Sequence, residues 1–210
     1  MADEYYVPFL ESAEDEFVEK KSRFIGRAYR VETEAEAQSI LDELRKKYWD
    51  ASHNVYAYSL LGGTTRCSDD GEPSGTAGRP TLEVITREGI TNVLVVVTRY
   101  FGGTLLGAGG LIRAYAHSAK IALDAAGTAA MRRVVNYSIR ADYTFFERLK
   151  LEVEAAGGEV TNVEYADAVT LELWIPDGGE DAFERRITEL TAGRVQPKPC
   201  GEARRAVRVK

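Results

Sequence analysis

The segment TNVLVVVTRY, residues 91–100, constrains the fold more than any other part of the sequence. Its centre is an uninterrupted run of branched apolar residues, which is typical of a β-strand that is covered on both faces. We therefore expect this strand to lie inside a sheet, with other elements packed above and below it.

Local patterns around this strand predict a mixed α+β unit. Thr33 and Glu36 have the spacing of a capping box at a helix start, and Gly127 has the character of a helix end. Pro80 suits the first turn of a short helix. The other elements expected in this half are strands over residues 16–31 and 54–61 and helices over residues 33–49 and 111–127.

The alternation of strands and helices starts again after Gly127. From there the patterns predict strand, helix, strand, strand, helix and strand, the βαββαβ order of a ferredoxin-like unit. We therefore expect an α+β protein of two domains, residues 1–130 and residues 131–210.

Composition limits the classes of function. The chain has 210 residues and a net charge of −6, which disfavours avid nucleic-acid binding by the whole surface but permits a local basic face. No window approaches ~18 uninterrupted apolar residues, so no membrane association is expected. The acidic N-terminus does not resemble a secretory signal. Cys67 and Cys200 match neither a metal motif nor a disulfide scaffold, so a cytoplasmic location is expected.

The segment SDDGEPSGTAGRP, residues 68–80, concentrates acidic residues and then small ones. A turn needs only one or two residues of this kind, so the segment is expected to form a longer loop. We assign the loop-shaping role to Ser68, Asp69, Asp70, Gly71, Glu72, Gly75, Thr76 and Gly78.

The segment RYFGGTLLGAGGLIRAY, residues 99–115, joins the buried strand to a helix through a glycine-rich turn. Backbone N–H groups at such a helix start can bind an oxyanion, and the helix dipole favours negative charge there. The segment is neither a Walker A loop nor a G-x-G-x-x-G fingerprint. The alternative is tight backbone packing with no ligand. The candidate anion- or RNA-binding residues are Arg99, Gly102, Gly103, Gly107, Gly109, Gly110, Arg113, His117 and Lys120.

The last three of these residues are spaced by four and three positions, so they share the helix face opposite the apolar one. That face is either a phosphate-contacting stripe that begins at the glycines or an ordinary solvated surface.

Three residues are weak candidates for catalysis: His53, Asp69 and Asp70. Only one other histidine exists, and no serine stands in a G-x-S-x-G elbow, so neither a zinc site nor a serine triad is indicated. We expect the two aspartates to pair with Arg99 or Arg113 and to hold their loop against the second glycine-rich segment. In the less favoured alternative they hold a Mg²⁺ that bridges to a phosphate. No metal or other cofactor is otherwise expected.

Four motifs, KKSRFIG, ASHNVYAY, SDDGEPSGTAG and RYFGGTLLGAGGLIRAY, together resemble the IMPACT family, and the two-domain layout looks like its bacterial YigZ branch. The resemblance implies an N-terminal domain of the type found in domain IV of elongation factor G and in a small-subunit ribosomal protein. It implies a C-terminal domain similar to domain V of elongation factor G. Galactokinase-type kinases share the N-terminal superfamily and hold phosphate at a glycine-rich helix start, which points to Gly107, Gly109 and Gly110.

Eukaryotic members of the family regulate translation by binding an activator of a stress kinase. The resemblance implies an association with the translation machinery rather than that partner. We favour a binding module that contacts RNA, ribosomal components or a protein partner. The alternative is an enzyme that acts on a phosphorylated or nucleotide ligand in a pocket between the two glycine-rich loops. The sequence does not predict an oligomeric state.

Overall fold

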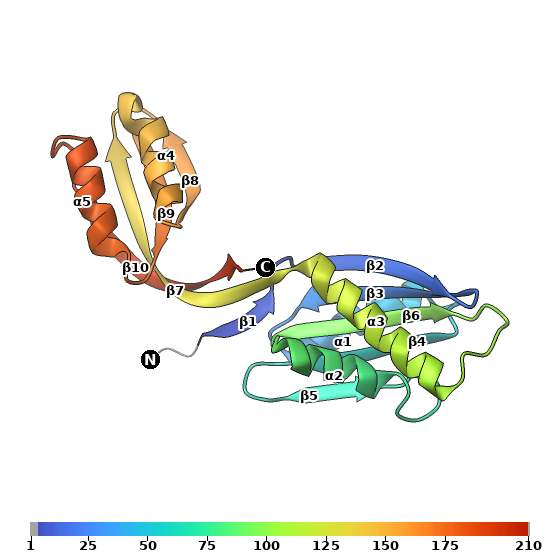
Figure 1. The fold of residues 1–210 in the computed structure, drawn as a ribbon. Helices are drawn as coiled ribbons and strands as arrows, with labels where there is room; N and C mark the ends of the chain where they lie inside the picture. Colours follow the sequence, from blue (N-terminus) through green and yellow to red (C-terminus); the bar gives the residue numbers. More distant parts are fainter. Residues whose placement is uncertain (1–3, 210) are drawn as a thin grey trace. The chain divides into compact units, whose positions relative to one another are not determined.

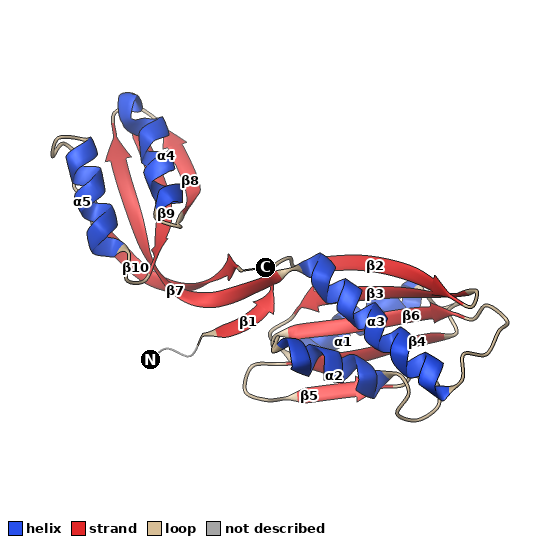
Figure 2. Cartoon of the chain, in the orientation of Figure 1, coloured by secondary structure: helices blue, strands red, loops and turns tan. Residues whose placement is uncertain are grey.

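The computed structural model describes residues 4–209 and combines helices and strands in two compact units (Figures 1 and 2). The N-terminal unit holds Tyr5–Ala130 together with the last part of the chain from Ala206. The C-terminal unit holds Met131–Arg205 and Glu4.

The N-terminal unit is built on a sheet of five antiparallel strands in the order β2-β3-β6-β4-β5. The strands are β2 (Ser12–Glu19), β3 (Ser22–Arg30), β4 (His53–Ser59), β5 (Thr65–Ser68) and β6 (Val93–Tyr100). The strand expected at residues 91–100 is β6, the central strand of this sheet.

Three helices cover the two faces of this sheet: α1 (Glu34–Lys47), α2 (Gly78–Glu88) and α3 (Ala108–Ala126). Val93, Val95 and Val97 of β6 pack in one core with side chains of α2 and α3. Leu94 and Val96 alternate with them and pack in a second core with side chains of α1. The prediction that β6 is buried on both faces is therefore confirmed.

The helix signals of the N-terminal unit are mostly confirmed. The Thr33 hydroxyl accepts a hydrogen bond from the Glu36 N–H, while the Glu36 carboxylate accepts the N–H of Glu32 instead of that of Thr33. Pro80 lies in the first turn of α2, and α3 ends just before Gly127. The helix α3 begins at Ala108, three residues earlier than the apolar spacing predicted, because its first turn consists of small residues without a periodic pattern.

The prediction of a single strand over residues 16–31 is wrong. The segment is a hairpin of β2 and β3 whose turn is made by Lys20 and Lys21. Both lysines adopt positive φ angles, 46° and 67°. Turns of this kind normally contain Asn or Gly. Because lysines occupy both positions here, the turn had no sequence signal.

The C-terminal unit has the predicted βαββαβ order. Its elements are β7 (Thr128–Ala141), a 3₁₀ turn η1 (Tyr143–Phe145), α4 (Phe146–Ala155), β8 (Glu159–Tyr165), β9 (Val169–Pro176), α5 (Glu180–Leu190) and β10 (Pro199–Arg208). The strands β7, β9 and β8 are neighbours in that order; β10 also pairs with β7, as does β1 (Tyr5–Pro8). Tyr137, Leu149 and Ile187 lie in the core of this unit. The likeness of the two units to domains of elongation factor G stays a prediction.

Candidate functional site

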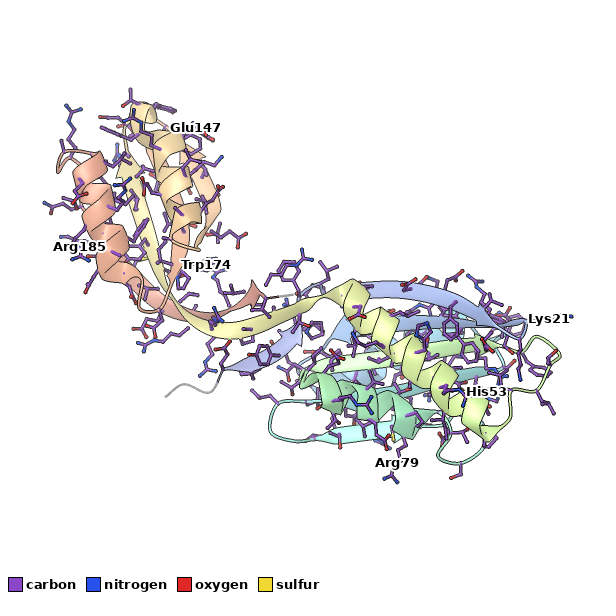
Figure 3. The ribbon with its side chains drawn as sticks, viewed as in Figure 1. Lys21, His53, Arg79, Glu147, Trp174 and Arg185 are labelled. Carbon is purple, nitrogen blue, oxygen red and sulfur yellow. The ribbon has the colours of Figure 1, made fainter. Side chains whose placement is uncertain are left out.

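The candidate site lies where four segments meet at one end of the N-terminal sheet. The antiparallel pairing of β4 with β6 sets His53 opposite Arg99, and that of β3 with β6 sets Arg23 opposite Tyr100. The ends of these strands, the loop between β5 and α2, and the segment between β6 and α3 therefore share one end of the unit. Figure 3 shows Lys21 and His53 near this end.

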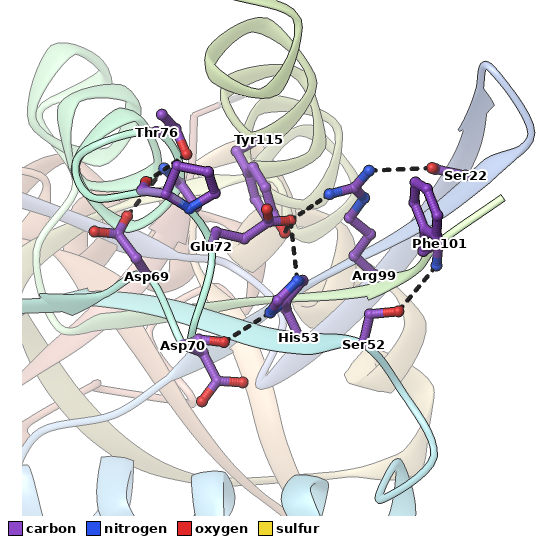
Figure 4. Close-up of polar contacts among 12 residues, drawn as sticks. Ser22, Ser52, His53, Asp69, Asp70, Glu72, Thr76, Arg99, Phe101 and Tyr115 are labelled. Carbon is purple, nitrogen blue, oxygen red and sulfur yellow. Dashed lines mark hydrogen bonds and ion pairs between the residues drawn. The ribbon is translucent and has the colours of Figure 1, made fainter. Parts of the chain in front are cut away.

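A buried ion pair forms the floor of the site (Figure 4). The Arg99 guanidinium donates from Nη1 to Glu72 Oε1 at 2.5 Å, and the Tyr115 hydroxyl donates to the same oxygen at 2.7 Å. Arg99 is 4% exposed and Glu72 is 8% exposed. Burial, followed by the hydrogen bond to Glu72, raises the pKa of the Tyr115 hydroxyl far above its usual value. Tyr115 therefore remains a hydrogen-bond donor at physiological pH.

Ser22 joins this floor to the glycine-rich segment. Its hydroxyl oxygen accepts hydrogen bonds from Arg99 Nη2 and from the Gly102 N–H, each at 3.2 Å. A Cβ on Gly102 would lie 2.0 Å from the carbonyl carbon of Lys21, so only glycine fits there without a shift of the backbone. Arg99 Nε is buried and has no hydrogen-bond partner among residues 4–209.

His53 faces the ion pair with one ring nitrogen. Its Nδ1 lies 2.8 Å from the carbonyl oxygen of Asp70. A carbonyl can only accept, so Nδ1 carries the proton in this bond, and Nε2 of the neutral ring is an acceptor. Nε2 lies 3.7 Å from Glu72 Oε1.

The expected pairing of Asp69 and Asp70 with Arg99 or Arg113 is wrong. The Asp69 carboxylate accepts the backbone N–H groups of Gly75, Ala77 and Gly78 at 2.9, 3.0 and 2.8 Å. The Asp70 carboxylate accepts the N–H of Asn54 at 2.6 Å.

The true partner of Arg99 is therefore Glu72, which the sequence placed only among the loop-shaping residues. The aspartates shape their loop by accepting hydrogen bonds from backbone N–H groups.

The ionised state of Asp69 is stabilised by these contacts. Burial by itself raises the pKa of the carboxyl group, but the hydrogen bonds from Gly75, Gly78 and Ala77 outweigh it and hold the pKa below the usual value. Thr76 also fixes the loop, because its hydroxyl donates to the Pro73 carbonyl at 2.6 Å.

The two glycine-containing segments face each other across a cavity of about 400 Å³. Its walls are mainly apolar, and its polar wall is formed by His53, Glu72 and Arg99. The lining residues are His53, Gly71, Glu72, Pro73, Arg99, Phe101, Leu105, Leu106, Gly107, Ala108 and Leu111.

The predicted glycines divide into two groups. A Cβ would collide with the Ser68 backbone at Gly78 and would lie 2.9 Å from Leu106 Cβ at Gly110, so packing accounts for these two, as it does for Gly102. A Cβ on Gly103 or Gly107 would meet no neighbour, and one on Gly109 would make only an ordinary contact with Arg113, so packing does not require glycine at these three positions.

The start of α3 at this cavity has a donor-rich first turn. Gly107 stands at the N-cap, makes no side-chain cap hydrogen bond, and is followed by no acidic residue in the first turn. The free N–H groups of this turn therefore lie at the cavity, and no carboxylate of the same turn offsets their partial positive charge.

Of the predicted basic stripe along α3, formed by Arg113, His117 and Lys120, only part is free to contact a phosphate. Arg113 is exposed and places Nη1 3.7 Å from the position of a Cβ on Gly109, so its guanidinium lies over the first turn. His117 packs edge-on against the ring of Phe17. Lys120 pairs with Asp124 and, at 3.6 Å, with Glu88. Only Arg113 of the three lies next to the glycine-rich segment.

Ser22, Ser52 and Tyr115 were missed as site residues. The Ser52 hydroxyl accepts the N–H of Phe101 at 3.1 Å. All three lie within or beside the motifs that carried the family resemblance, but their partners are far away in sequence. Local patterns cannot show which face of a strand meets which loop, so these contacts had no sequence signal.

Metal-ligand clusters and membrane-spanning helices both bear on the class of function. Within residues 4–209, no three His, Cys, Asp or Glu side chains gather as a metal site would require. None of the helices in the described part of the chain is long and apolar enough to cross a membrane.

Comparison with known domains defines the class of protein. Residues 20–123 match the Impact N-terminal domain, and residues 139–194 match a domain of unknown function, DUF1949. The chain thus combines the domain that contains the cavity with a second, uncharacterised one.

Individual relatives span both parts. The IMPACT family member YvyE of Bacillus subtilis is 39% identical over 192 residues, which is 90% of this chain and 88% of that protein. The IMPACT family member YigZ of Escherichia coli is 30% identical over 182 residues, or 84% of this chain and 89% of that protein. The chain belongs to the IMPACT family, in its bacterial YigZ-like branch.

A solved structure supports the overall fold. A crystal structure of a hypothetical protein is 27% identical, covers 94% of this chain and 97% of its own, and gives a TM-score of 0.60. The mixed two-domain α/β fold is therefore that of an already observed structure.

Proposed function

We propose that this protein is a translation-linked binding module that contacts single-stranded RNA through the cavity end of its N-terminal unit. Membership of the IMPACT family supports the link to translation, because eukaryotic members regulate it. The gathering of unpaired basic and exposed aromatic side chains at one end of the domain supports RNA as the ligand. We call this surface the basic end and define it as Lys20, Lys21, Trp49, Phe101 and Arg113.

The positive charges of the basic end are available to a ligand. Lys20, Lys21 and Arg113 are exposed, and in the described part of the chain none of them forms an ion pair. Glu19 offsets one of these charges. Since phosphate contacts of this kind dominate the affinity of RNA-binding proteins, a local basic surface can bind RNA despite the net charge of −6.

Two aromatic side chains lie exposed at the same end. Trp49 is 82% exposed and Phe101 is 48% exposed. They are held close together in the fold, because the Phe101 N–H donates to Ser52 and the Tyr100 hydroxyl donates to Asp50, both in the segment that follows Trp49. Stacking of bases on exposed aromatic rings beside a basic groove is the usual way in which proteins hold single strands.

The neighbouring acidic residues do not cancel this surface. Asp69 and Asp70 bind backbone N–H groups, and Glu72 is neutralised by Arg99. The charges of Asp69 and Asp70 are thus offset by backbone donors and that of Glu72 by Arg99, so an approaching phosphate meets less repulsion from them.

A second candidate function is an enzyme that acts on a phosphorylated or nucleotide ligand. It is favoured by one observation, the acceptor nitrogen of His53 beside Glu72 in an apolar cavity. A histidine in this state can serve as a general base. Turnover of small nucleotides by the full-length protein, lost in His53→Gln, would establish this activity.

The RNA proposal is tested by the salt dependence of binding. In a variant with Lys20→Asn and Lys21→Gly, two charges are removed while the turn receives residues that prefer its backbone conformation. Binding of a 12-nucleotide single-stranded RNA, followed by fluorescence anisotropy, should weaken. The slope of log K against log salt should fall by about 1.4, because each contact contributes about 0.7.

A variant with Lys150→Ala and Lys198→Ala is the matched control, because it removes equal charge from the C-terminal unit. It should bind like the parent. Equal losses in both variants, or a parent that ignores RNA at low salt, would overturn the proposal.

A further inference from the structure

We propose that the cavity between the two glycine-rich segments accepts one unpaired guanine nucleotide of the bound RNA. The assignment rests on the proposed function and adds a specific base to it. Its basis is the arrangement of hydrogen-bond acceptors on the polar wall of the cavity.

Glu72 contributes the first acceptor. Its Oε1 is occupied by Arg99 and Tyr115, whereas its Oε2 has no hydrogen-bond partner within residues 4–209. The residue is more than nine-tenths buried, yet it lines the cavity. Oε2 is not fully buried, so a ligand can reach it from the cavity that Glu72 lines. A buried carboxylate oxygen without a donor lacks part of the hydrogen bonding it would have in water, and a ligand N–H restores it.

His53 contributes the second acceptor. In the neutral ring, whose Nδ1–H is held by the Asp70 carbonyl, Nε2 presents a lone pair beside Glu72. The mouth of the cavity therefore offers two neighbouring acceptors. The ligand that complements them carries two neighbouring donors on one planar edge.

Guanine is the base that meets this requirement. Its Watson–Crick edge carries N1–H and the N2 amino group side by side. On adenine and cytosine, the amino group stands next to a ring nitrogen that accepts, and this nitrogen would face the lone pairs of Glu72 or His53. On uracil, a single N–H stands between two carbonyl groups. Unpaired bases are commonly recognised on this edge.

The remaining walls suit the other parts of a nucleotide. Pro73, Leu106 and Leu111 provide apolar contacts for the ring, and Phe101 lies half exposed at the rim. The uncapped first turn of α3 and the guanidinium of Arg113 are available to the 5′-phosphate. A cavity of about 400 Å³ lies within the range of small-molecule sites and fits one nucleotide rather than a duplex.

The first experiment compares free nucleotides on the full-length parent protein by isothermal titration calorimetry. Guanosine monophosphate should bind most tightly. Inosine monophosphate, which lacks the N2 amino group, should bind about tenfold more weakly, and adenosine monophosphate weaker still, in line with the usual discrimination by a bidentate contact. Equal affinities for the three would refute the guanine assignment without any variant.

Two variants locate the recognition. In Glu72→Gln, an amide replaces the free carboxylate oxygen, so the preference for guanosine over inosine monophosphate should disappear. Tyr115→Phe is the matched control, because it disturbs the same buried cluster but leaves Oε2 in the cavity. It should retain the preference. A preference that survives Glu72→Gln in a folded protein would overturn the role of this residue.

A second experiment separates this inference from the proposed function. A uridine 12-mer and the same strand with one central guanosine are compared on the parent. Tighter binding of the guanosine strand, competed by guanosine monophosphate, is expected. Equal binding of both strands leaves RNA binding intact and removes the guanine site. Failure of both strands to bind removes the proposed function and the RNA-bound guanine together, and guanosine monophosphate binding alone would then favour the nucleotide enzyme.

Discussion

Replacement of Asp69 by alanine should strongly destabilise the N-terminal unit, because this one carboxylate fixes the loop between β5 and α2. The variant removes the acceptor of three backbone N–H groups, two of which belong to the start of α2. A hydrogen bond to a charged acceptor contributes about 1.5–3 kcal/mol when buried. Asp69 is only half-buried, so water replaces part of each bond, and about 1 kcal/mol per bond is the expected net loss. Asp69→Ala should therefore cost about 3 kcal/mol.

Urea denaturation followed by circular dichroism measures this cost. With an m value of about 2 kcal/mol/M, the midpoint of the N-terminal unit should fall by about 1.5 M, while the transition of the C-terminal unit remains as an internal reference. Asp70→Ala is the matched control, because Asp70 accepts one N–H, that of Asn54. It should shift the midpoint by about 0.5 M. Equal shifts in the two variants would refute this reading of the loop.

The pH dependence supplies an independent check with a definite sign. The pKa of Asp69 is lower in the folded protein than in the unfolded chain. Its contribution is therefore complete above the unfolded value of about 3.9 and is lost as the pH falls through the folded value. The stability gap between parent and Asp69→Ala should be constant from about pH 7 to about pH 5 and should narrow below that range. A gap that widens on acidification contradicts the assignment.

Three further predictions follow from the same unit. Gly102→Ala places a methyl group against the Lys21 backbone and should cost about 3 kcal/mol in urea denaturation. Gly103→Ala meets no neighbour and should cost only the strain of alanine at a φ of 80°, about 1–2 kcal/mol. Equal costs in the two variants would contradict the packing role of Gly102. The variant with Lys20→Asn and Lys21→Gly removes the strain of two lysines at positive φ angles. Its free energy of unfolding should rise by about 1–2 kcal/mol. A fragment of residues 1–130 should show a cooperative melt, and an insoluble or molten fragment would mean that the domain boundary is misplaced.

Patterns that repeat along the chain were sufficient to predict most elements. The apolar run of β6 identified a strand buried on both faces, and the restart after Gly127 identified the βαββαβ unit. The two short strands β1 and β5 were missed, because four residues of mixed polarity carry no periodic signal. The hairpin turn was missed because its residues are lysines rather than Asn or Gly.

Sequence reasoning found the segments of the candidate site but not their pairing. It placed the two glycine-rich segments opposite each other, and the cavity lies between them. It assigned Arg99 to an aspartate, although the partner is Glu72, two positions beyond the second aspartate. Which of three carboxylates in four positions turns inward depends on the left-handed backbone at Asp70 and Gly71, and charge spacing does not reveal that conformation.

The Ser22 side chain connects two parts of the candidate site. Its hydroxyl oxygen accepts one hydrogen bond from Arg99 on the cavity floor and one from Gly102 of the glycine-rich segment. The preceding residue, Lys21, belongs to the hairpin turn. If RNA binds as proposed, a strand held at the turn would act on the same serine that orients the Arg99 guanidinium behind Glu72. Binding of RNA at the turn and binding of a nucleotide in the cavity would then be energetically coupled through Ser22. By linkage, each ligand would change the affinity of the other by the same factor. In Ser22→Ala this coupling should be lost, so the two ligands would bind independently.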